Sequence, residues 1–369
     1  MWGDIMIAFS IAFMTAFMAT PYTIKIAKKL GAVDSPKDER RINKVTMPRL
    51  GGLAVIAGFI VSIAYLLIVL SIEGNINLSQ DSYNKKLLGF ALGGLIISAV
   101  CFVDDVKGLP AIVKLLAQIL AASVAIYFGI RIENIDIPFF KISSNHIIET
   151  IITIGWIVGI TNAMNLIDGL DGLSTGISII SCISLLMIFS LNDSPLISII
   201  LITALGGALI GFLPYNFNPA RTFIGDTGSN FLGYCLSIIS IFGIAKTYTA
   251  IVIVAPLIVL GLPIFDTLFA ICRRLKNGKS LKAIVEPDAG HLHHRMLKMG
   301  FTQKQAVLIL YGLSAILGMF AIIWIDSGIW KAISFAMIMI LIILMGYKEF
   351  FEQRLLCNPE NEIKEDEKK

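Results

Sequence analysis

The sequence predicts an all-α fold, a polytopic transmembrane bundle of about eleven spans. Of its 369 residues 56% are hydrophobic and 15% are charged, and the mean hydropathy is +0.81; a soluble chain carries about 25% charged residues. The apolar residues also form blocks without charge, such as 50–70 and 87–103, each near the roughly 20 residues that a helix needs to cross a bilayer. These blocks are apolar on all sides, unlike the amphipathic helices of soluble cores.

Eleven such segments follow one another along the chain. The first has neither a basic start nor a cleavage site of small residues, so we expect a retained span and not a signal peptide. Two are less uniform, because 111–130 carries Lys114 and 147–167 begins close to Glu149 and ends in polar residues. The predicted spans are 2–23, 50–70, 87–103, 111–130, 147–167, 173–191, 195–213, 228–245, 248–271, 303–324 and 328–346.

The chain is expected to form one integral membrane domain over residues 1–346, which carries the candidate site, and a charged cytoplasmic tail over 347–369. The tail ends in NEIKEDEKK, a composition typical of a short helix followed by disorder. The sequence shows no internal repeat and no pair of interrupted helices of the kind found in many transporters. A membrane transporter is kept as the alternative from another functional class.

Basic residues are divided unequally between the two sets of loops that eleven spans create. The set that includes 24–49, 272–302 and the tail holds 22 Lys and Arg residues, and the other set holds 5. Positively charged residues stay in the cytoplasm. We therefore predict a multi-pass plasma-membrane protein with its amino terminus outside, its carboxyl terminus in the cytoplasm and its candidate site facing the cytoplasm.

The first cytoplasmic loop is the most basic part of the chain near its start, with eight Lys and Arg residues from Lys25 to Arg49. Topology and attraction to lipid headgroups explain such a loop; a landing site for an anionic lipid is the functional alternative. We assign Lys44, Arg49, Lys114 and Arg295 to substrate binding. No nucleic-acid partner is expected.

Two adjacent carboxylates, Asp104 and Asp105, end the third predicted span in the sequence FVDDVKG. Neighbouring carboxylates at a membrane boundary repel each other and lose hydration. Such a pair persists where a divalent cation, a shared proton or a nearby base relieves the repulsion. A solvated helix end would need only one acidic residue, so both are candidate catalytic residues.

A stripe of amides and carboxylates ends the fifth span, in TNAMNLIDGLDGLSTG. Asn162, Asn165, Asp168 and Asp171 recur every third residue, which places them along one side of a helix with a drift of about 60° per step. The glycines that follow break the helix and let backbone approach a ligand. This stripe is expected to bind a polar ligand or a hydrated metal; a polar helix packed against its neighbours is the alternative.

The loop before the eighth span, FNPARTFIGDTGSNFLG, combines the residue types of a phosphate and metal site. Asp226 is expected to hold magnesium, which prefers carboxylate, water and phosphate oxygens. Gly228, Ser229 and the start of the helix offer backbone N–H groups to phosphate. Arg221 is expected to pair with phosphate, and Phe223 to stack on a base.

Three of the four histidines lie together in DAGHLHHRMLKMG, at His291, His293 and His294. A zinc site is one interpretation, but one short loop supplies no evident fourth ligand, so anion binding or proton handling beside phosphate is favoured. No role is expected for His146, which lies in an external loop. For Asp266, at the end of the ninth span, a structural ion pair and a site role are both left open.

Taken in order, these motifs resemble those of the polyprenyl-phosphate N-acetylhexosamine-1-phosphate transferases, integral membrane enzymes of glycosyltransferase family 4 with ten or eleven spans. The HLHHR sequence resembles the branch that uses UDP-GlcNAc and starts teichoic acid, O-antigen or related glycans. The alternative is the phospho-MurNAc-pentapeptide transferase branch of peptidoglycan synthesis, which carries three consecutive histidines; here Leu292 interrupts them. The matching stretches are PRLGGL at 48–53, DD at 104–105, NAMNLIDGLDGL at 162–173, FIGDTGSNFLG at 223–233 and GHLHHR at 290–295.

The resemblance implies a Mg²⁺-dependent transfer of GlcNAc-1-phosphate from UDP-GlcNAc to undecaprenyl phosphate, giving undecaprenyl-diphospho-GlcNAc and UMP. Mn²⁺ is an alternative metal, and a homodimer is left open. By motif position Asp226 resembles the metal ligand, Asp104 the residue that deprotonates or positions the lipid phosphate, and Phe223 the uracil-stacking residue. The remaining assignments are a second metal ligand at Asp168, catalytic roles for Asp105, Asp168, His291, His293 and His294, and substrate contacts for Asn162, Asn165, Asp171 and Arg221.

A phosphate monoester has a second pKa near 6 and is largely a dianion at neutral pH. A strong general base at Asp104 is therefore not required by the chemistry. A covalent intermediate on an aspartate is a further alternative that the sequence leaves open.

Overall fold

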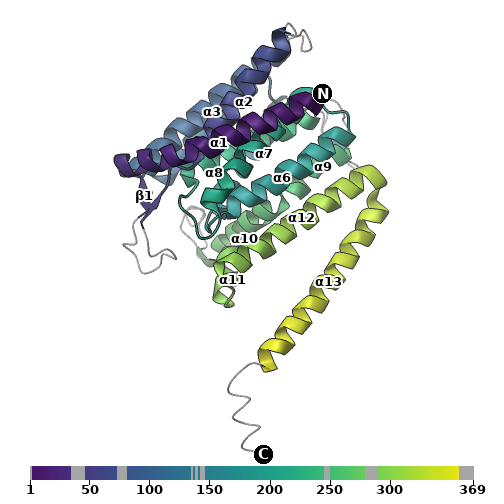
Figure 1. Ribbon diagram of the computed structural model, residues 1–369. Helices are drawn as coiled ribbons and strands as arrows, with labels where there is room; N and C mark the ends of the chain where they lie inside the picture. Colours follow the sequence, from purple (N-terminus) through teal and green to yellow (C-terminus); the bar gives the residue numbers. More distant parts are fainter. Residues whose placement is uncertain are drawn as a thin grey trace, which may run out of the picture.

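The structure is a computed structural model that describes residues 2–34, 46–72, 81–133, 136–137, 140–141, 146–244, 250–278 and 290–356. These residues form a bundle of α-helices with two short antiparallel β-ladders (Figure 1). The helices are α1 (Trp2–Leu30), α2 (Gly52–Ile72), α3 (Asp81–Lys107), α4 (Ala111–Tyr127), α5 (His146–Ile167), α6 (Leu173–Leu191), α7 (Leu196–Asn216), α8 (Gly225–Ile244), α9 (Ala250–Val259), α10 (Gly261–Gly278), α11 (Leu292–Lys298), α12 (Gln303–Ser327) and α13 (Ile329–Leu356). The ladders pair β1 (Val33–Asp34) with β2 (Met47–Pro48), and β3 (Asp136–Ile137) with β4 (Phe140–Lys141).

Helices occupy the predicted spans. Within the described ranges seven helices are long and apolar enough to cross a membrane, namely α1, α2, α3, α5, α6, α7 and α12. Helix α4 and residues 329–344 of α13 are shorter apolar helices. The prediction of an all-α polytopic membrane protein is confirmed, while the number of crossings stays a prediction.

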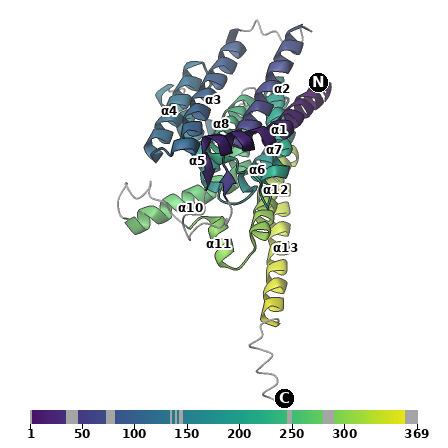
Figure 2. The same cartoon turned by 60° about the vertical axis from the view of Figure 1, so that its left-hand side comes forward.

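The structure divides one predicted span, 248–271, into two helices. Helix α9 ends at Val259 and α10 begins at Gly261. Pro263 lacks the N–H that would bond to a carbonyl one turn earlier, and its ring clashes with that turn, which bends or breaks a helix. Figure 2 shows α10 directed away from the body of the bundle.

Close backbone contact holds α1 against α7. A Cβ atom added at Gly207 or Gly211 on α7 would overlap backbone atoms of Phe9 or Phe13 on α1. Small residues at helix interfaces allow this approach, and in a membrane such packing replaces the hydrophobic driving force available in water. Helix α7 is thereby buried along most of its length.

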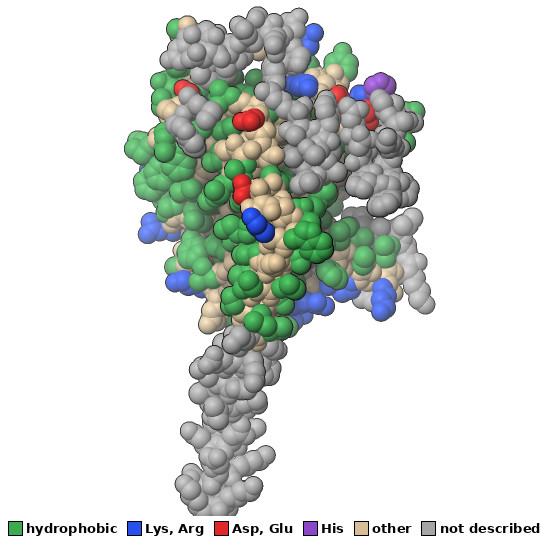
Figure 3. All heavy atoms as spheres, turned by 90° about the vertical axis from the view of Figure 1, so that its right-hand side faces the viewer, with side chains coloured by type: hydrophobic (Ala, Val, Ile, Leu, Met, Phe, Trp, Pro, Cys, Tyr) green, Lys and Arg blue, Asp and Glu red, His purple; other side chains and the backbone are tan. Residues whose placement is uncertain are grey.

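Large apolar side chains remain exposed on the outside of the bundle, including Leu95 and Ile151. Figure 3 shows that hydrophobic side chains cover much of the middle of one face. This distribution is costly in water but is required of a surface that contacts lipid.

The helix ends that carry the predicted motifs meet at one end of the bundle. Helices α3 and α5 end there, while α2, α4 and α8 begin there, and α8 packs against α2, α3 and α5. A Cβ atom on Gly52 or Gly228 would overlap the backbone of the other segment. Glycine at both positions therefore lets α2 and α8 start in direct contact.

Candidate active site

Two segments far apart in the sequence join at the base of α8. The N–H of Phe223 donates to the carbonyl of Pro48 (2.8 Å), and the N–H of Gly51 donates to the carbonyl of Phe223 (3.0 Å). A side chain at Gly51 would overlap Phe223, and one at Gly52 would overlap the start of α8. Backbone packing therefore explains the glycines of PRLGGL, and it places Arg49 beside α8.

The carboxylate of Asp105 caps the first turn of α8. One oxygen accepts a hydrogen bond from the N–H of Asp226 (3.0 Å), and the other accepts from the N–H and hydroxyl of Thr227 (2.9 and 2.6 Å). The N–H groups at a helix start favour a negative charge there. Sequence reasoning assigned Asp105 a catalytic role, but the structure surrounds its oxygens with protein donors. Asp105 joins α3 to α8 and so brings Asp104 close to Asp226.

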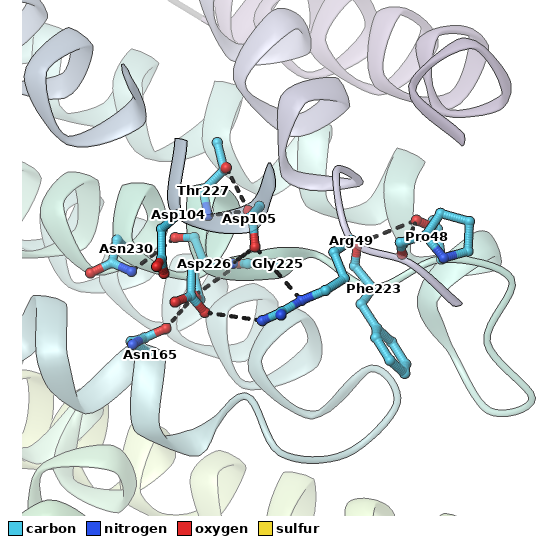
Figure 4. A network of polar contacts seen from close by, with 12 residues as sticks. Pro48, Arg49, Asp104, Asp105, Asn165, Phe223, Gly225, Asp226, Thr227 and Asn230 are labelled. Carbon is cyan, nitrogen blue, oxygen red and sulfur yellow. Dashed lines mark hydrogen bonds and ion pairs between the residues drawn. The ribbon is translucent and has the colours of Figure 1, made fainter. Parts of the chain in front are cut away.

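Asp104, Lys114 and Asp226 form the centre of the site. The Lys114 ammonium lies 2.5 Å from an Asp226 oxygen and 2.9 Å from an Asp104 oxygen. The other Asp104 oxygen accepts from the N–H of Leu109 (2.5 Å), and the Arg49 guanidinium lies 3.7 Å from Asp226. Figure 4 shows the side chains of Arg49, Asp104 and Asp226 converging. The ammonium thus bridges carboxylates from α3 and α8.

Asp168 belongs to the same cluster. It lies in the turn between α5 and α6, and its carboxylate accepts a hydrogen bond from the Ser174 hydroxyl (2.5 Å). Burial, together with the nearby charge of Asp226, raises the pKa of Asp168 to about 7. Asp168 therefore lies within electrostatic reach of Asp226, on the turn that follows α5.

Asn162 and Asn165, the two asparagines near the end of α5, lie at different distances from the carboxylates. The Ser229 hydroxyl donates to the side-chain oxygen of Asn165 (2.8 Å), which links α5 to α8 beside the carboxylates. Asn162 lies one turn further from the site and donates to Gln118 on α4 (2.6 Å). Gln118 in turn donates to Asn230 on α8 (2.8 Å). Asn162, predicted to contact substrate, is thus placed in a chain of amides beneath the carboxylates.

Asp171 holds the loop that leads into α8. One of its oxygens accepts from the side-chain amide of Asn218 (2.9 Å) and from the N–H of Ala220 (3.1 Å). Arg221, the next residue of that loop, has an exposed side chain. Figure 4 shows the Phe223 ring pointing away from the carboxylates. Asp171 therefore fixes the loop, while Arg221 and Phe223 lie at the rim of the site.

Asp266 on α10 supports the histidine segment. One of its oxygens lies 2.8 Å from Nδ1 of His291, and the other accepts from the N–H of Leu292 (2.8 Å) at the start of α11. His291 and Asp266 are both buried. Of the two roles left open for Asp266, the geometry shows a structural one, with His291 as the partner.

His293 connects the histidine segment to the acidic cluster. Its ring packs against His294, with ring centroids 4.3 Å apart, and against Gly169, where a Cβ atom would overlap the imidazole. Burial, reinforced by His294, lowers the pKa of His293 to about 4. This imidazole is therefore neutral at physiological pH and lies next to the turn that carries Asp168. Arg295, one residue beyond His294, is exposed.

The carboxylates fit magnesium better than the histidines fit zinc. Across the described part of the chain, no three His, Cys, Asp or Glu side chains are arranged around one metal position, so the zinc alternative lacks a ligand set there. Magnesium is usually held by one or two carboxylates, with waters and substrate phosphates as the other ligands. Asp226 and Asp168, on different helix ends, can supply these carboxylates.

Three residues that contact the predicted site residues, Gln118, Thr227 and Ser174, were not predicted from the sequence. Gln118 carried a usable signal, because it follows Lys114 by one helical turn in an otherwise apolar segment. Thr227 and Ser174 carried none, since hydroxyl residues are common in membrane helices. Lys44, predicted to bind substrate, lies outside the described residues.

Comparisons with known proteins agree with the geometry. The family model described as glycosyl transferase family 4 matches residues 87–244. A probable undecaprenyl-phosphate N-acetylglucosaminyl 1-phosphate transferase of Bacillus subtilis is 37% identical, over 92% of this chain and 90% of the relative. A decaprenyl-phosphate N-acetylglucosaminephosphotransferase of Mycobacterium tuberculosis is 32% identical, over 83% and 78%. A phospho-N-acetylmuramoyl-pentapeptide-transferase of Staphylococcus epidermidis is 35% identical over a smaller part, 63% and 74%.

Proposed function

The chain belongs to glycosyl transferase family 4, and on that premise we propose that it transfers GlcNAc-1-phosphate from UDP-GlcNAc to undecaprenyl phosphate. The products are undecaprenyl-diphospho-GlcNAc and UMP. The reaction is the first membrane step of a cell-envelope glycan such as a teichoic acid or an O-antigen. The names of the relatives that align with most of the chain support a polyprenyl phosphate as the acceptor.

An excess of negative charge at one end of the bundle is the observation that carries the proposal. Among the described residues, the site contains four carboxylates and two cations: Asp104, Asp105, Asp168, Asp226, Arg49 and Lys114. Buried charges of one sign are costly unless a ligand of the other sign compensates them. Transfer between two phosphates needs such a cation, because the donor and the acceptor are both anions.

The protein groups have distinct tasks in this scheme. Asp226 and Asp168 would hold Mg²⁺, which when bound neutralises the diphosphate oxygens and stabilises the leaving group; Mn²⁺ suits the same oxygen ligands. Lys114 and Arg49 neutralise phosphate charge beside the carboxylates. Asp105 keeps α3 and α8 in register, and the neutral His293 offers hydrogen bonds without adding charge.

Asp104 is assigned an orienting role. Its two oxygens are already engaged by the N–H of Leu109 and the ammonium of Lys114. A nucleophile or a general base must point at the reacting atom, whereas these two contacts hold the Asp104 carboxylate toward Leu109 and Lys114. Because the acceptor phosphate is already largely a dianion at neutral pH, direct attack on the donor diphosphate requires neither.

Two side chains at the rim, the exposed Arg221 and the half-buried Phe223, suit the nucleotide. Phe223 is assigned to the uracil ring and Arg221 to phosphate, because both lie outside the carboxylate cluster on the loop that Asp171 holds. The asymmetry of 22 against 5 basic residues supports a site that faces the cytoplasm, eleven crossings and an external amino terminus.

UDP-GlcNAc is favoured as the donor over UDP-MurNAc-pentapeptide. The GlcNAc-phosphate relatives align with 92% and 83% of this chain, whereas the MurNAc-pentapeptide relative aligns with 63%. Leu292 also separates the histidines that are consecutive in the MurNAc-pentapeptide branch. Its backbone N–H is bonded to Asp266 at the start of α11.

A donor panel tests the proposal. Full-length protein in detergent receives UDP-GlcNAc or UDP-MurNAc-pentapeptide, with and without undecaprenyl phosphate, in Mg²⁺ or in EDTA, and released UMP is measured. We expect UMP only from UDP-GlcNAc, and only with both acceptor and metal present. Release from UDP-MurNAc-pentapeptide alone would move the chain to the other branch, and release without acceptor would refute a transfer to lipid.

A further inference from the structure

Helix α4 buries a face made almost entirely of small residues. Its buried side chains are Ala117, Gln118, Ala121, Ala122, Ala125 and Ile126. Alanines let helices approach closely, but they have little shape with which to fix the rotation or height of a helix. Gln118, which is 2% exposed, is the polar exception on this face.

Every polar atom of the Gln118 side chain is engaged, and each partner lies on a different helix. Its oxygen accepts from the amide of Asn162 on α5 (2.6 Å), and its nitrogen donates to the side-chain oxygen of Asn230 on α8 (2.8 Å). The Asn230 amide then donates to the carbonyl of Asp226 (2.8 Å). A chain of hydrogen bonds therefore runs from α5 through α4 to the backbone of Asp226.

Lys114 lies on the same face of α4, one turn closer to the site, because residues four apart are neighbours on a helix. Its ammonium makes short contacts with carboxylates on two other helices, Asp104 at 2.9 Å and Asp226 at 2.5 Å. A rotation or a slide of α4 by a fraction of a turn would withdraw Lys114 from both. The Gln118 amide chain resists this motion, because an unpaired amide in an apolar interior is costly.

We propose that Gln118 is a positioning residue that locks α4 to α5 and α8 and so holds the Lys114 ammonium between Asp104 and Asp226. It acts through Lys114 and touches neither substrate nor metal. The inference rests on the proposed function, because its test measures UMP release. It adds Gln118 to the site as the residue that positions Lys114.

Two substitutions test this role in the full-length protein. Gln118→Leu keeps the approximate size but leaves Asn230 without its donor, and Gln118→Glu keeps the acceptor for Asn162 while losing the same donor. We expect kcat/KM for UMP release to fall about 10- to 100-fold in both, as for residues that orient metal-site groups, with a higher Mg²⁺ concentration at half-maximal rate. Ser123→Ala, on the exposed face of α4, is the matched control and should behave as wild type.

A double-mutant cycle with Lys114→Arg separates positioning from general destabilisation. If Gln118 acts through Lys114, the double variant will be little slower than Lys114→Arg alone. If the two losses multiply, the link to Lys114 is refuted. Wild-type rates in both Gln118 variants would also overturn the proposal, and thermal unfolding in detergent shows whether each variant is folded. If Gln118→Leu is unfolded, the cycle is run with Gln118→Glu.

The wild-type assay keeps this inference distinct from the proposed function. A wild-type protein that releases no UMP from UDP-GlcNAc contradicts the proposed function, whatever the variants do. An active wild type with unaffected Gln118 variants contradicts only the positioning role.

Discussion

The two ends of α5 carry polar clusters of opposite character. At the carboxyl-terminal end of α5, Asn165 and the following Asp168 belong to the acidic site. At its start, one turn holds His146 and the buried Glu149, with Arg131 beside them. The helix has 22 residues, so at 1.5 Å per residue the clusters are about 33 Å apart.

The clusters differ in charge balance. The Arg131 guanidinium lies 3.9 Å from the Glu149 carboxylate, and His146 lies 3.4 Å from it. Within this cluster of three described side chains, one carboxylate thus meets one permanent cation and no negative charge is left over. In the part of the chain that the structure describes, the site end gathers more carboxylates than cations. The comparison teaches that the proposed site is distinguished by uncompensated charge, since both ends of α5 contain buried charge.

The largest effect is expected at Asp226, the proposed metal ligand. Asp226→Asn removes a negative charge but keeps the shape and the start of α8. We expect turnover to fall by about 10²- to 10³-fold or more, the scale seen when a main charge-stabilising group is lost. The measurement is UMP release by protein whose thermal unfolding matches wild type, and near-normal turnover would show that the metal assignment is wrong.

The pH dependence of metal binding comes next. Because the pKa of Asp168 is raised to about 7, its carboxyl is protonated at pH 6 and ionised at pH 8, and Mg²⁺ must compete with the proton below pH 7. We expect the Mg²⁺ concentration that gives half-maximal thermal stabilisation to be about tenfold higher at pH 6 than at pH 8. Asp168→Asn should weaken this dependence and leave a smaller one from Asp226, whose pKa is raised by burial to about 6, whereas a pH-independent midpoint in wild type would contradict it.

Without metal, in EDTA, pH is expected to affect the stability of the protein in the opposite direction: stability falls as pH rises. The folded pKa of Asp168 lies above its ordinary value of 3.8. Its contribution to the free energy of unfolding is therefore fully present below about pH 4 and is lost as pH rises through 7. We therefore expect wild-type protein to be more stable at pH 8 than at pH 6 when Mg²⁺ is present. In EDTA this difference should disappear or reverse.

A smaller effect, on stability more than on chemistry, is expected at Asp105. Asp105→Asn presents an amide group where the N–H groups of Asp226 and Thr227 need acceptors. We expect the free energy of unfolding to fall by about 1–2 kcal/mol, as for other lost helix caps, and turnover to fall less than in Asp226→Asn. Thermal unfolding in EDTA measures the first effect without the metal. A variant as stable as wild type would remove Asp105 from the cap.

The smallest effects are expected in the cluster at the start of α5, formed by Arg131, His146 and Glu149. His146→Ala should leave kinetic constants unchanged, and Glu149→Gln should cost about 1 kcal/mol of stability while kcat and the Mg²⁺ requirement stay at wild-type values. Steady-state kinetics of both variants check this. A change in the Mg²⁺ requirement in either variant would break the comparison between the two ends.

Much of this arrangement could be predicted from the sequence, for physical reasons. Hydrophobic blocks reveal spans because lipid requires apolar surfaces all round a helix. Charged residues at span ends are expensive, so Asp104, Asp168 and Asp226 stood out as candidates. The division of 248–271 at Gly261 also had a visible cause in Pro263, although the sequence analysis treated the segment as one span.

Other features could not be predicted, because they depend on contacts between distant segments. Nothing local to Asp105 shows that Thr227, more than a hundred residues later, engages it. Asp171 has the same spacing as Asp168 but serves a loop that the stripe pattern does not reveal. The position of Gln118 one turn after Lys114 was a visible signal, but its role depends on Asn162 and Asn230 meeting it, and the sequence does not show those contacts.

Binding of Mn²⁺, a spectroscopic substitute for Mg²⁺, tests the central claim most directly. Electron paramagnetic resonance is used to titrate Mn²⁺ into full-length protein saturated with UDP, for wild type, Asp226→Asn and Glu149→Gln. We predict one tight Mn²⁺ site in wild type and in Glu149→Gln, and its loss in Asp226→Asn. An undiminished Mn²⁺ site in folded Asp226→Asn would contradict the account, because the excess carboxylates would then not be what holds the cation.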